Sequence, residues 1–158
     1  MKNIKKLVAF LFLLVIISFS SYAQDYNTAI GVRLGSGTGI TIKHFIESNA
    51  ALEGILDTRW EGVRITGLYE VHKKIPNANG LGWYYGVGAH IGFWSNRNLR
   101  NEFANASAII GIDGIIALDY TFKELPLNLS VDWKPAFNII GYSGFWGDEI
   151  AVGIRYAF

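Results

Sequence analysis

A histidine, an acid and a serine are the first residues of this sequence that could together do covalent chemistry. His90 and Asp113 lie in two successive segments of alternating polarity, and Ser95 and Ser107 lie between them. A serine activated by a histidine that an acid orients is the nucleophilic arrangement of many hydrolases. Both His90 and Asp113 fall on the polar side of their segments, where a hydrogen-bonded interior histidine is the more ordinary outcome. We therefore favour a structural role for His90 and predict no catalytic residue.

The remaining histidines give no sign of metal chemistry. His44, His72 and His90 are the three histidines, the chain has no cysteine, and no histidine pair has the spacing of metal ligands. No stripe of basic residues suggests nucleic-acid binding. We predict no metal, no cofactor and no nucleic-acid partner.

The elements that position these residues are predicted to be β-strands. In "LNLSVDWK", residues 127–134, apolar and polar side chains alternate without interruption, and a period of two puts them on opposite faces of a strand. Clusters of Gly, Asn, Ser and Pro separate further segments of this kind. The predicted strands are 28–35, 38–46, 50–60, 62–73, 81–94, 107–123, 126–134 and 149–158. Eight short strands with regular turns favour an all-β, up-and-down antiparallel meander.

Alternation alone leaves open whether the apolar face meets a soluble core or lipid. The polar face is rich in Gly and Ala, which a crowded barrel interior requires and a solvated surface does not. Its charges nearly balance, as buried charges must. We predict that these charges form an ion-pair network in the lumen of a closed eight-stranded barrel. The network comprises Arg33, Lys43, Glu53, Asp57, Arg59, Arg64, Glu70, Asp113, Asp119, Lys123, Asp132, Lys134 and Arg155.

Aromatic residues of the apolar face also favour a lipid-facing wall, because they fall near strand ends. Two aromatic belts mark the two interfaces of a membrane barrel. One predicted belt contains Trp83, Tyr85, Tyr120, Phe122, Tyr156 and Phe158. The opposite rim is predicted to hold Trp60, Phe93 and Trp133.

The first residues are predicted to be a cleaved secretory signal peptide, residues 1–23. Three lysines precede an apolar stretch of 11 residues from Leu7 to Ile17, and Ser21-Tyr22-Ala23 suits the cleavage site. Removing this segment takes three of the 14 Lys and Arg residues and leaves 11 against 13 Asp and Glu, a formal charge of −2. Residues 24–158 are predicted to form a single domain.

The chain ends in "GIRYAF", and Gly153, Ile154, Tyr156 and Phe158 form an alternating pattern with a terminal aromatic residue. This pattern resembles the signal that outer-membrane barrels present to their assembly machinery. With the eight strands, and with "LDYTFKELPLNLSVDWKPAFN", the chain resembles the small outer-membrane barrels of the OmpA-transmembrane, OmpX and OmpW type.

The resemblance implies an antiparallel barrel with both termini in the periplasm. Connections 36–37, 61, 95–106 and 135–148 would then face outward. Two features depart from the family pattern, since the connection at 61–62 is short for an outer loop and the turn at 74–80 is long for a periplasmic one.

The two longest outer connections carry the candidate surface contacts. Aromatic rings there could bind a partner, although headgroup-level or mouth-covering rings are the more ordinary reading, and the arginines could contact lipopolysaccharide phosphates. These candidates are Arg97, Arg100, Phe137, Tyr142, Phe145 and Trp146. Thirteen charged side chains in so narrow a lumen leave no room for a large aqueous channel.

The prediction is therefore an integral barrel of the outer membrane of a Gram-negative bacterium, with a structural or cell-surface role. The expected partners are outer-membrane lipids, lipopolysaccharide and the assembly machinery, and we expect a monomer. Two alternatives stay open: a lipid A-modifying enzyme, which some small barrels are, and a soluble lipocalin-like carrier with its faces reversed.

Overall fold

The described part of the chain forms ten β-strands. The computed structural model describes residues 26–59, 62–94, 107–141 and 144–158. The strands are β1 (Thr28–Gly35), β2 (Thr38–Glu47), β3 (Ala50–Arg59), β4 (Gly62–Lys74), β5 (Leu81–Trp94), β6 (Ser107–Thr121), β7 (Leu127–Trp133), β8 (Ala136–Ile140), β9 (Gly144–Trp146) and β10 (Ile150–Ala157). Within the described residues there is no helix long and apolar enough to cross a membrane.

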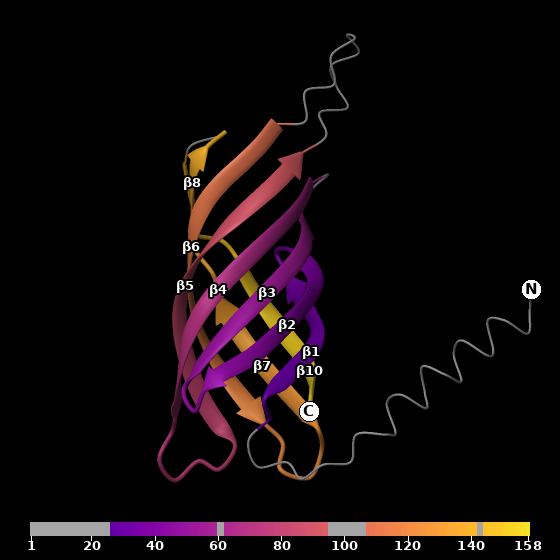
Figure 1. Ribbon diagram of the computed structural model, residues 1–158, viewed down its shortest axis with the longest axis vertical. Helices are drawn as coiled ribbons and strands as arrows, with labels where there is room; N and C mark the ends of the chain where they lie inside the picture. The colour runs from indigo at the N-terminus through magenta and orange to yellow at the C-terminus, as the bar shows by residue number, and fades with distance from the viewer. Residues whose placement is uncertain (1–25, 60–61, 95–106, 142–143) are drawn as a thin grey trace, which may run out of the picture.

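Antiparallel pairing closes the strands into a barrel (Figure 1). Each strand from β1 to β6 pairs with the next, and β10 returns to lie between β7 and β1. The pairing of β1 with β10 closes the sheet. Because β8 continues β7 along β6, and β9 and β10 both pair with this run, the ten strands make eight staves, and the eight-stranded closed barrel predicted from the sequence is confirmed. The first and last strands meet near Thr28 and Phe158, whose backbone groups exchange two hydrogen bonds. We call the end that holds these termini the inner end, and the opposite one the outer end.

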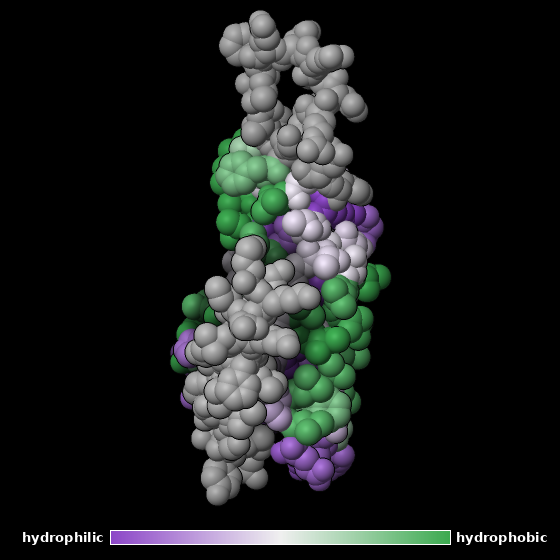
Figure 2. All heavy atoms as spheres, turned by 90° about the vertical axis from the view of Figure 1, so that its right-hand side faces the viewer, coloured by the Kyte–Doolittle hydropathy of each residue, from purple (hydrophilic) through white to green (hydrophobic). Residues whose placement is uncertain are grey.

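Side chains alternate between lumen and outer wall along every strand. In β4 the inward residues from Gly62 to Glu70 are buried, and the residues between them are exposed. Apolar side chains dominate the outward positions of all the long strands, with Ile40, Val87 and Ile65 each more than half exposed. Figure 2 shows this apolar wall over part of the barrel surface. The polar face therefore lies inside, as a membrane barrel requires.

Glycines on the lumen side make room for neighbouring side chains. A Cβ on Gly88 would lie 2.0 Å from the carbonyl oxygen of Gly67 and 2.8 Å from the Leu68 side chain. At Gly111 it would lie 2.5 Å from the imidazole of His90. Larger residues of the adjacent strand thus lie across these glycines, which is why a narrow lumen requires them.

The predicted outer connection 135–148 is not all loop, because it contains β8 at 136–140 and β9 at 144–146. β7 and β8 share one register along β6: Trp133 pairs with Ile116, and Phe137 pairs with Ile112. Pro135 interrupts the run but its carbonyl oxygen still accepts from the Gly114 N–H at 2.9 Å. β9 then folds back to pair with β8. Proline lacks a donor but keeps its acceptor, so the strand continues through it.

Two smaller predictions are corrected by the same geometry. Trp133 lies inside the continuous β7–β8 run, so it is not at the outer rim as predicted. β6 ends at Thr121 rather than at 123, and Lys123 is exposed in the turn that follows. Lys123 is therefore not a lumen residue. Predicted ends elsewhere agree with the observed strands to within one residue, apart from Trp60, which lies outside the described residues.

Candidate functional site

The lumen is filled by side chains, and its charged groups fall into two clusters. The outer cluster contains Arg33, Asp57, Arg64, His90, Asp113, Asp132, Lys134, Asn138 and Glu149. The inner cluster contains Thr41, Lys43, Glu53, Glu70, His72, Tyr84, Asn128, Ser130 and Arg155. Almost all of these side chains are buried, so both clusters are enclosed by the wall.

Glu149 is the hub of the outer cluster. It lies directly before β10, where the Lys134 N–H donates to its carbonyl oxygen at 2.8 Å. Its carboxylate, which has no exposed surface, accepts from Arg33 at 3.2 Å, forms an ion pair with Lys134 at 3.3 Å, and accepts from Arg64. Three cations therefore converge on one buried carboxylate.

Each of these cations also has an aspartate of its own. Asp132 accepts from the Nε and Nη2 atoms of Arg33, and Asp57 accepts from the Nε and Nη2 atoms of Arg64 at 3.1 and 2.7 Å. Asp113 accepts from Lys134 at 2.8 Å. Bidentate pairs of this kind fix both guanidinium planes. The outer cluster thus has the form of a star: Glu149 is at its centre, and each of the three cations around it also forms an ion pair with its own aspartate.

His90 extends the outer cluster without forming a catalytic triad. Its Nδ1 lies 2.7 Å from Asp113, and its Nε2 lies 2.9 Å from the side-chain oxygen of Asn138. Both ring nitrogens are occupied by these partners. His90 pairs with Gly111, and Ser107 stands four residues further along β6, about 13 Å away at the rise of a strand. The register separates Ser107 from His90, and Ser95 lies outside the described residues.

In the inner cluster the ion pairs form a line and do not converge on one residue. Arg155 donates to Glu53 at 2.6 Å, Glu53 pairs with Lys43 at 3.3 Å, and Lys43 pairs with Glu70 at 2.8 Å. Within the described residues Glu53 is the one carboxylate paired with Arg155, whose other hydrogen bonds go to the neutral side chains of Ser130 and Asn128. The two residues in the middle of this line, Glu53 and Lys43, therefore each form ion pairs with two partners.

Aromatic rings close the inner end of the lumen. Tyr84 stacks on His72 at 4.5 Å, His72 contacts Phe45 at 4.7 Å, and Phe45 contacts Tyr26 at 5.2 Å. The Lys43 ammonium lies 3.7 Å from the centre of the Tyr84 ring. Tyr26 precedes β1, and burial raises the pKa of its hydroxyl to about 12. Four rings thus continue the inner cluster towards the mouth at the termini.

An apolar layer separates the two clusters. Ile55 lies between the inward positions of Glu53 and Asp57, and Leu68 lies between those of Thr66 and Glu70. The layer consists of Ile55, Leu68, Ile115 and Ala117, and the ring of Tyr84, a member of the inner cluster, groups with them. Going from the outer end to the inner end, the lumen therefore holds a charged cluster, an apolar layer, a second charged cluster and an aromatic stack.

Two predicted network residues, Arg59 and Lys123, lie outside the two clusters, and a third, Asp119, borders the inner cluster through Asn128. Arg59 donates at 2.6 Å to Asp148, whose side chain is 66 % exposed, and it lies over the Trp146 ring. Asp119 is partly buried and accepts from Asn128 at 3.1 Å. Lys123, as noted, is exposed. The other ten predicted residues lie in the two clusters.

Sequence reasoning missed the hub and several neutral members. Glu149 shares the alternation of β10 with Ala151 and Arg155, and that parity could have placed it inside. Asn138 falls in a predicted connection because Pro135 signals the end of a strand. Tyr84 and Ile55 occupy inward positions where an aromatic or apolar residue breaks the polar pattern, and this break is the signal of the apolar layer.

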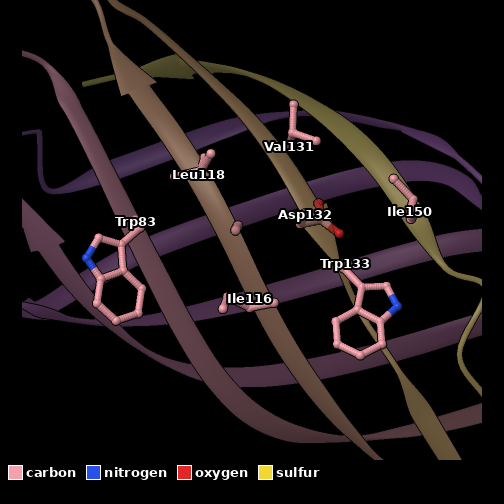
Figure 3. A pocket seen from close by; sticks show the side chains of 8 residues that line it. Trp83, Ile116, Leu118, Val131, Asp132, Trp133 and Ile150 are labelled. Carbon is pink, nitrogen blue, oxygen red and sulfur yellow. The ribbon is translucent and has the colours of Figure 1, made fainter. Parts of the chain in front are cut away.

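Three of the six predicted surface contacts lie on β8 and β9. Phe137 is on β8, and Phe145 and Trp146 are on β9, whereas Arg97, Arg100 and Tyr142 lie outside the described residues. Trp133 lies lower, where the wall has a shallow apolar hollow of about 420 Å³. Figure 3 shows the indoles of Trp83 and Trp133 on either side of Ile116 in this hollow.

The predicted assembly signal lies on β10 and directly after it, at Gly153, Ile154, Tyr156 and Phe158. Ile154 faces outward, and the rings of Tyr156 and Phe158 are 6.1 Å apart. Their recognition by the assembly machinery stays a prediction.

No family model and no curated protein matches this sequence. Among solved structures, the chain is similar to the N-terminal β-barrel domain of Pseudomonas aeruginosa OprF, with a TM-score of 0.68 and 17 % identity. The match covers 85 % of this chain and 100 % of that one. The chain therefore has the fold of that small β-barrel domain. At this level of identity the likeness concerns the fold, whereas the chemistry must be argued from the barrel's own residues.

The buried carboxylates of this small barrel are held in ion pairs. Among the described residues no three His, Cys, Asp or Glu side chains are grouped as ligands for a metal ion. The carboxylates of Asp57, Asp132 and Glu149 are instead occupied by arginines, which leaves no open coordination site among them.

Proposed function

We propose that this protein is an integral barrel of the outer membrane of a Gram-negative bacterium, with a structural or cell-surface role and no large pore. The observation that carries the proposal is the sequence of layers inside the wall. Two ion-paired clusters, an apolar layer and an aromatic stack occupy the lumen in succession. An open aqueous path through these layers would require breaking several buried ion pairs at once.

The wall supports the membrane part of the proposal. Outward side chains that are more than a third exposed include isoleucines, valines and leucines on every long strand. At the inner end, aromatic pairs Trp83–Tyr85 and Tyr120–Phe122 form one side of a belt, with ring centres 5.5 and 4.8 Å apart. Such a belt is typical of a lipid–water interface. In a soluble carrier the apolar side chains would line the interior instead.

The experiment combines cell fractionation with conductance. We expect the protein in the outer-membrane fraction, migrating faster on a detergent gel before heating than after. Purified barrel in a planar bilayer is expected to give no steady porin-like conductance. Recovery in the soluble periplasmic fraction would contradict membrane insertion, and a large stable current would contradict the filled lumen.

A lipid-modifying enzyme is the weaker candidate, because both ring nitrogens of His90 are occupied inside the lumen, away from acyl chains. Loss of a lipid A-modifying activity in a folded His90→Ala variant would revive it.

A further inference from the structure

The side chains of His90 and Asn138 meet over a glycine in the outer part of the lumen. His90 of β5 pairs with Gly111 of β6, and Gly111 pairs with Asn138 of β8, so the three residues form one row. Figure 1 shows β5, β6 and β8 next to one another in the upper part of the barrel. A Cβ on Gly111 would lie 2.5 Å from the imidazole and 2.4 Å from the Phe137 carbonyl oxygen. Glycine therefore allows the imidazole to lie across β6 and reach Asn138.

Both ring nitrogens of His90 face oxygen atoms. Nδ1 lies 2.7 Å from a carboxylate oxygen of Asp113, and Nε2 lies 2.9 Å from the side-chain oxygen of Asn138. A neutral imidazole has one N–H and one lone pair, so in either tautomer one of these contacts brings two acceptors together. An imidazolium donates at both nitrogens and satisfies both contacts. The three residues are each 3 % exposed, so bulk water does not relieve a mismatch between them.

The charge balance of the outer cluster supports the same protonation state independently. Within the described residues the cluster holds three Arg and Lys side chains against four carboxylates. The carboxylates are those of Asp57, Asp113, Asp132 and Glu149. One negative charge is left over, and a buried charge requires a partner. Among the described members of the cluster, His90 is the side chain that can gain a positive charge near neutral pH.

The charged groups on the elements around His90 are already paired. From β4, the neutral Thr66 pairs with His90, and Arg64 is held by Asp57 and Glu149. From the β7–β8 run, Lys134 donates to the other oxygen of Asp113 at 2.8 Å and also pairs with Glu149. Across the lumen, Arg33 of β1 is held by Asp132 and Glu149. Because each of these cations has carboxylates of its own, its repulsion of a charged imidazole is reduced.

We infer that His90 is a proton-binding site, held as an imidazolium that ties β8 to β5 across β6. Its two N–H groups join Asp113 to Asn138, next to the point where the pairing of β6 with β8 is irregular, between Ile110 and Gly111. Loss of the proton removes the donor to Asn138 and leaves one carboxylate of the cluster without a balancing charge. β8, and β9 paired with it, then lose a side-chain bond to β5. The outer end of the barrel therefore loosens as the pH rises. The inference rests on the fold and does not require the membrane location.

The direction of the pH effect follows from the number of protons bound in each state. In the folded chain His90 keeps its proton at about pH 8, where the free imidazole of an unfolded chain is mostly neutral. The folded state then holds one more proton than the unfolded state, so stability falls as the pH rises. The fall approaches about tenfold in the folding equilibrium constant for each pH unit. The contribution of His90 is complete in mildly acidic solution and is lost on the alkaline side.

Nitrogen NMR of isotope-labelled histidine tests the protonation state directly. The barrel is folded into detergent micelles and checked for heat-modifiable migration. It has three histidines, and His90→Gln identifies the signals of His90 by their loss. We expect two protonated ring nitrogens at His90 at about pH 8. One protonated and one unprotonated nitrogen at that pH would overturn the inference.

Two variants of neighbouring residues should move the titration of His90 in opposite directions. Glu149→Gln removes one carboxylate of the cluster, so His90 is expected to release its proton at a lower pH than in the wild type. Asn138→Asp replaces the side-chain nitrogen by a second oxygen and adds a negative charge, so the proton is expected to stay bound to a higher pH. Glu124→Gln, in the exposed turn after β6, is the control and should change nothing. These shifts also identify the His90 signal if His90→Gln does not fold. The reverse order, or no shift in either variant, contradicts the inference.

Urea unfolding between about pH 7 and 9 measures the consequence for stability. The wild type is expected to lose stability over this range, and His90→Gln, which cannot bind a proton, is expected to have a flatter profile. Equal slopes in the two proteins would show that other groups cause the loss and would overturn the role of His90.

A spin label reports whether the loosening is local, because the chain has no cysteine of its own. Phe145→Cys places the label on β9, and Val131→Cys places it on β7 as the control. We expect the label at 145 to become more mobile at alkaline pH and the label at 131 to stay as it is. An equal change at both positions, or no change at 145, would contradict the tie between β8 and β5.

Discussion

Both charged clusters of the lumen pair buried charges, but their ion pairs are connected in different ways. In the outer cluster each of Arg33, Arg64 and Lys134 has its own aspartate and shares Glu149. In the inner cluster the charges form a line, from Arg155 through Glu53 and Lys43 to Glu70. Removing one member of a star leaves complete pairs behind, whereas removing an interior member of a line strands its neighbour.

The balance of charge sharpens this difference. The outer cluster holds three Arg and Lys side chains against the four carboxylates of Asp57, Asp113, Asp132 and Glu149, while the inner line holds two against two. Loss of one outer carboxylate therefore leaves equal numbers, and loss of one inner carboxylate leaves an unbalanced cation. A buried charge without a partner is far more costly than a pair that was never formed.

The largest effect is expected from Glu53→Gln. This change leaves the Arg155 guanidinium in the lumen without a carboxylate among the described residues, and we expect it to lower the free energy of unfolding by about 3–5 kcal/mol. The measurement is urea unfolding in vesicles, followed by tryptophan fluorescence. Glu124→Gln, in the exposed turn after β6, is the matched control. Equal stability of the two variants would show that the line carries no net stabilisation.

Glu149→Gln is expected to cost less although it removes the hub. Arg33, Arg64 and Lys134 each retain an aspartate, and the glutamine oxygen can still accept one hydrogen bond, so we expect a loss of about 1–2 kcal/mol. The same unfolding experiment compares it with Glu53→Gln. A larger loss for Glu149→Gln than for Glu53→Gln would reverse the contrast between star and line.

Tyr84 tests the boundary between the inner cluster and the apolar layer. Its ring lies against Lys43, whereas its buried hydroxyl has no hydrogen-bond partner among the described residues. Tyr84→Leu should lower stability by about 1–2 kcal/mol through the lost ring contact. Tyr84→Phe keeps the ring and should leave stability unchanged or slightly raised. If Tyr84→Phe lowers stability as much as Tyr84→Leu, the hydroxyl contributes to stability and the ring contact does not explain the loss.

The smallest effect is expected from Lys123→Ala. This lysine is exposed in the turn after β6, so its removal should change stability by less than about 0.5 kcal/mol. Lys43→Ala, inside the inner line, is the contrasting variant and should lower stability by several times as much. A loss at Lys123 equal to that at Lys43 would contradict its position outside both clusters.

Much of the barrel could be predicted from alternation because strand faces are a local property. The period of two in residues 127–134 assigns Asp132 and Lys134 to one side without any knowledge of their neighbours. The glycines of the polar face then indicate that this side is crowded, and in the structure Gly88 and Gly111 do lie close to larger side chains.

Partners could not be predicted, because they depend on which strands lie across the lumen. Arg33 and Asp132 are 99 residues apart, and Arg155 and Glu53 are 102 apart. Only barrel closure and strand register bring such pairs within reach, and a change of register by one residue would turn every one of these side chains to the opposite face.

The sequence by itself determined the strands, the two faces and the identity of most of the charges that lie inside. The tertiary structure decided that β8 continues β7 past Pro135 and that Glu149 joins three cations. The physical reason is that alternation is a property of neighbouring residues, whereas strand pairing and ion-pair partners depend on the registers around the whole closed sheet.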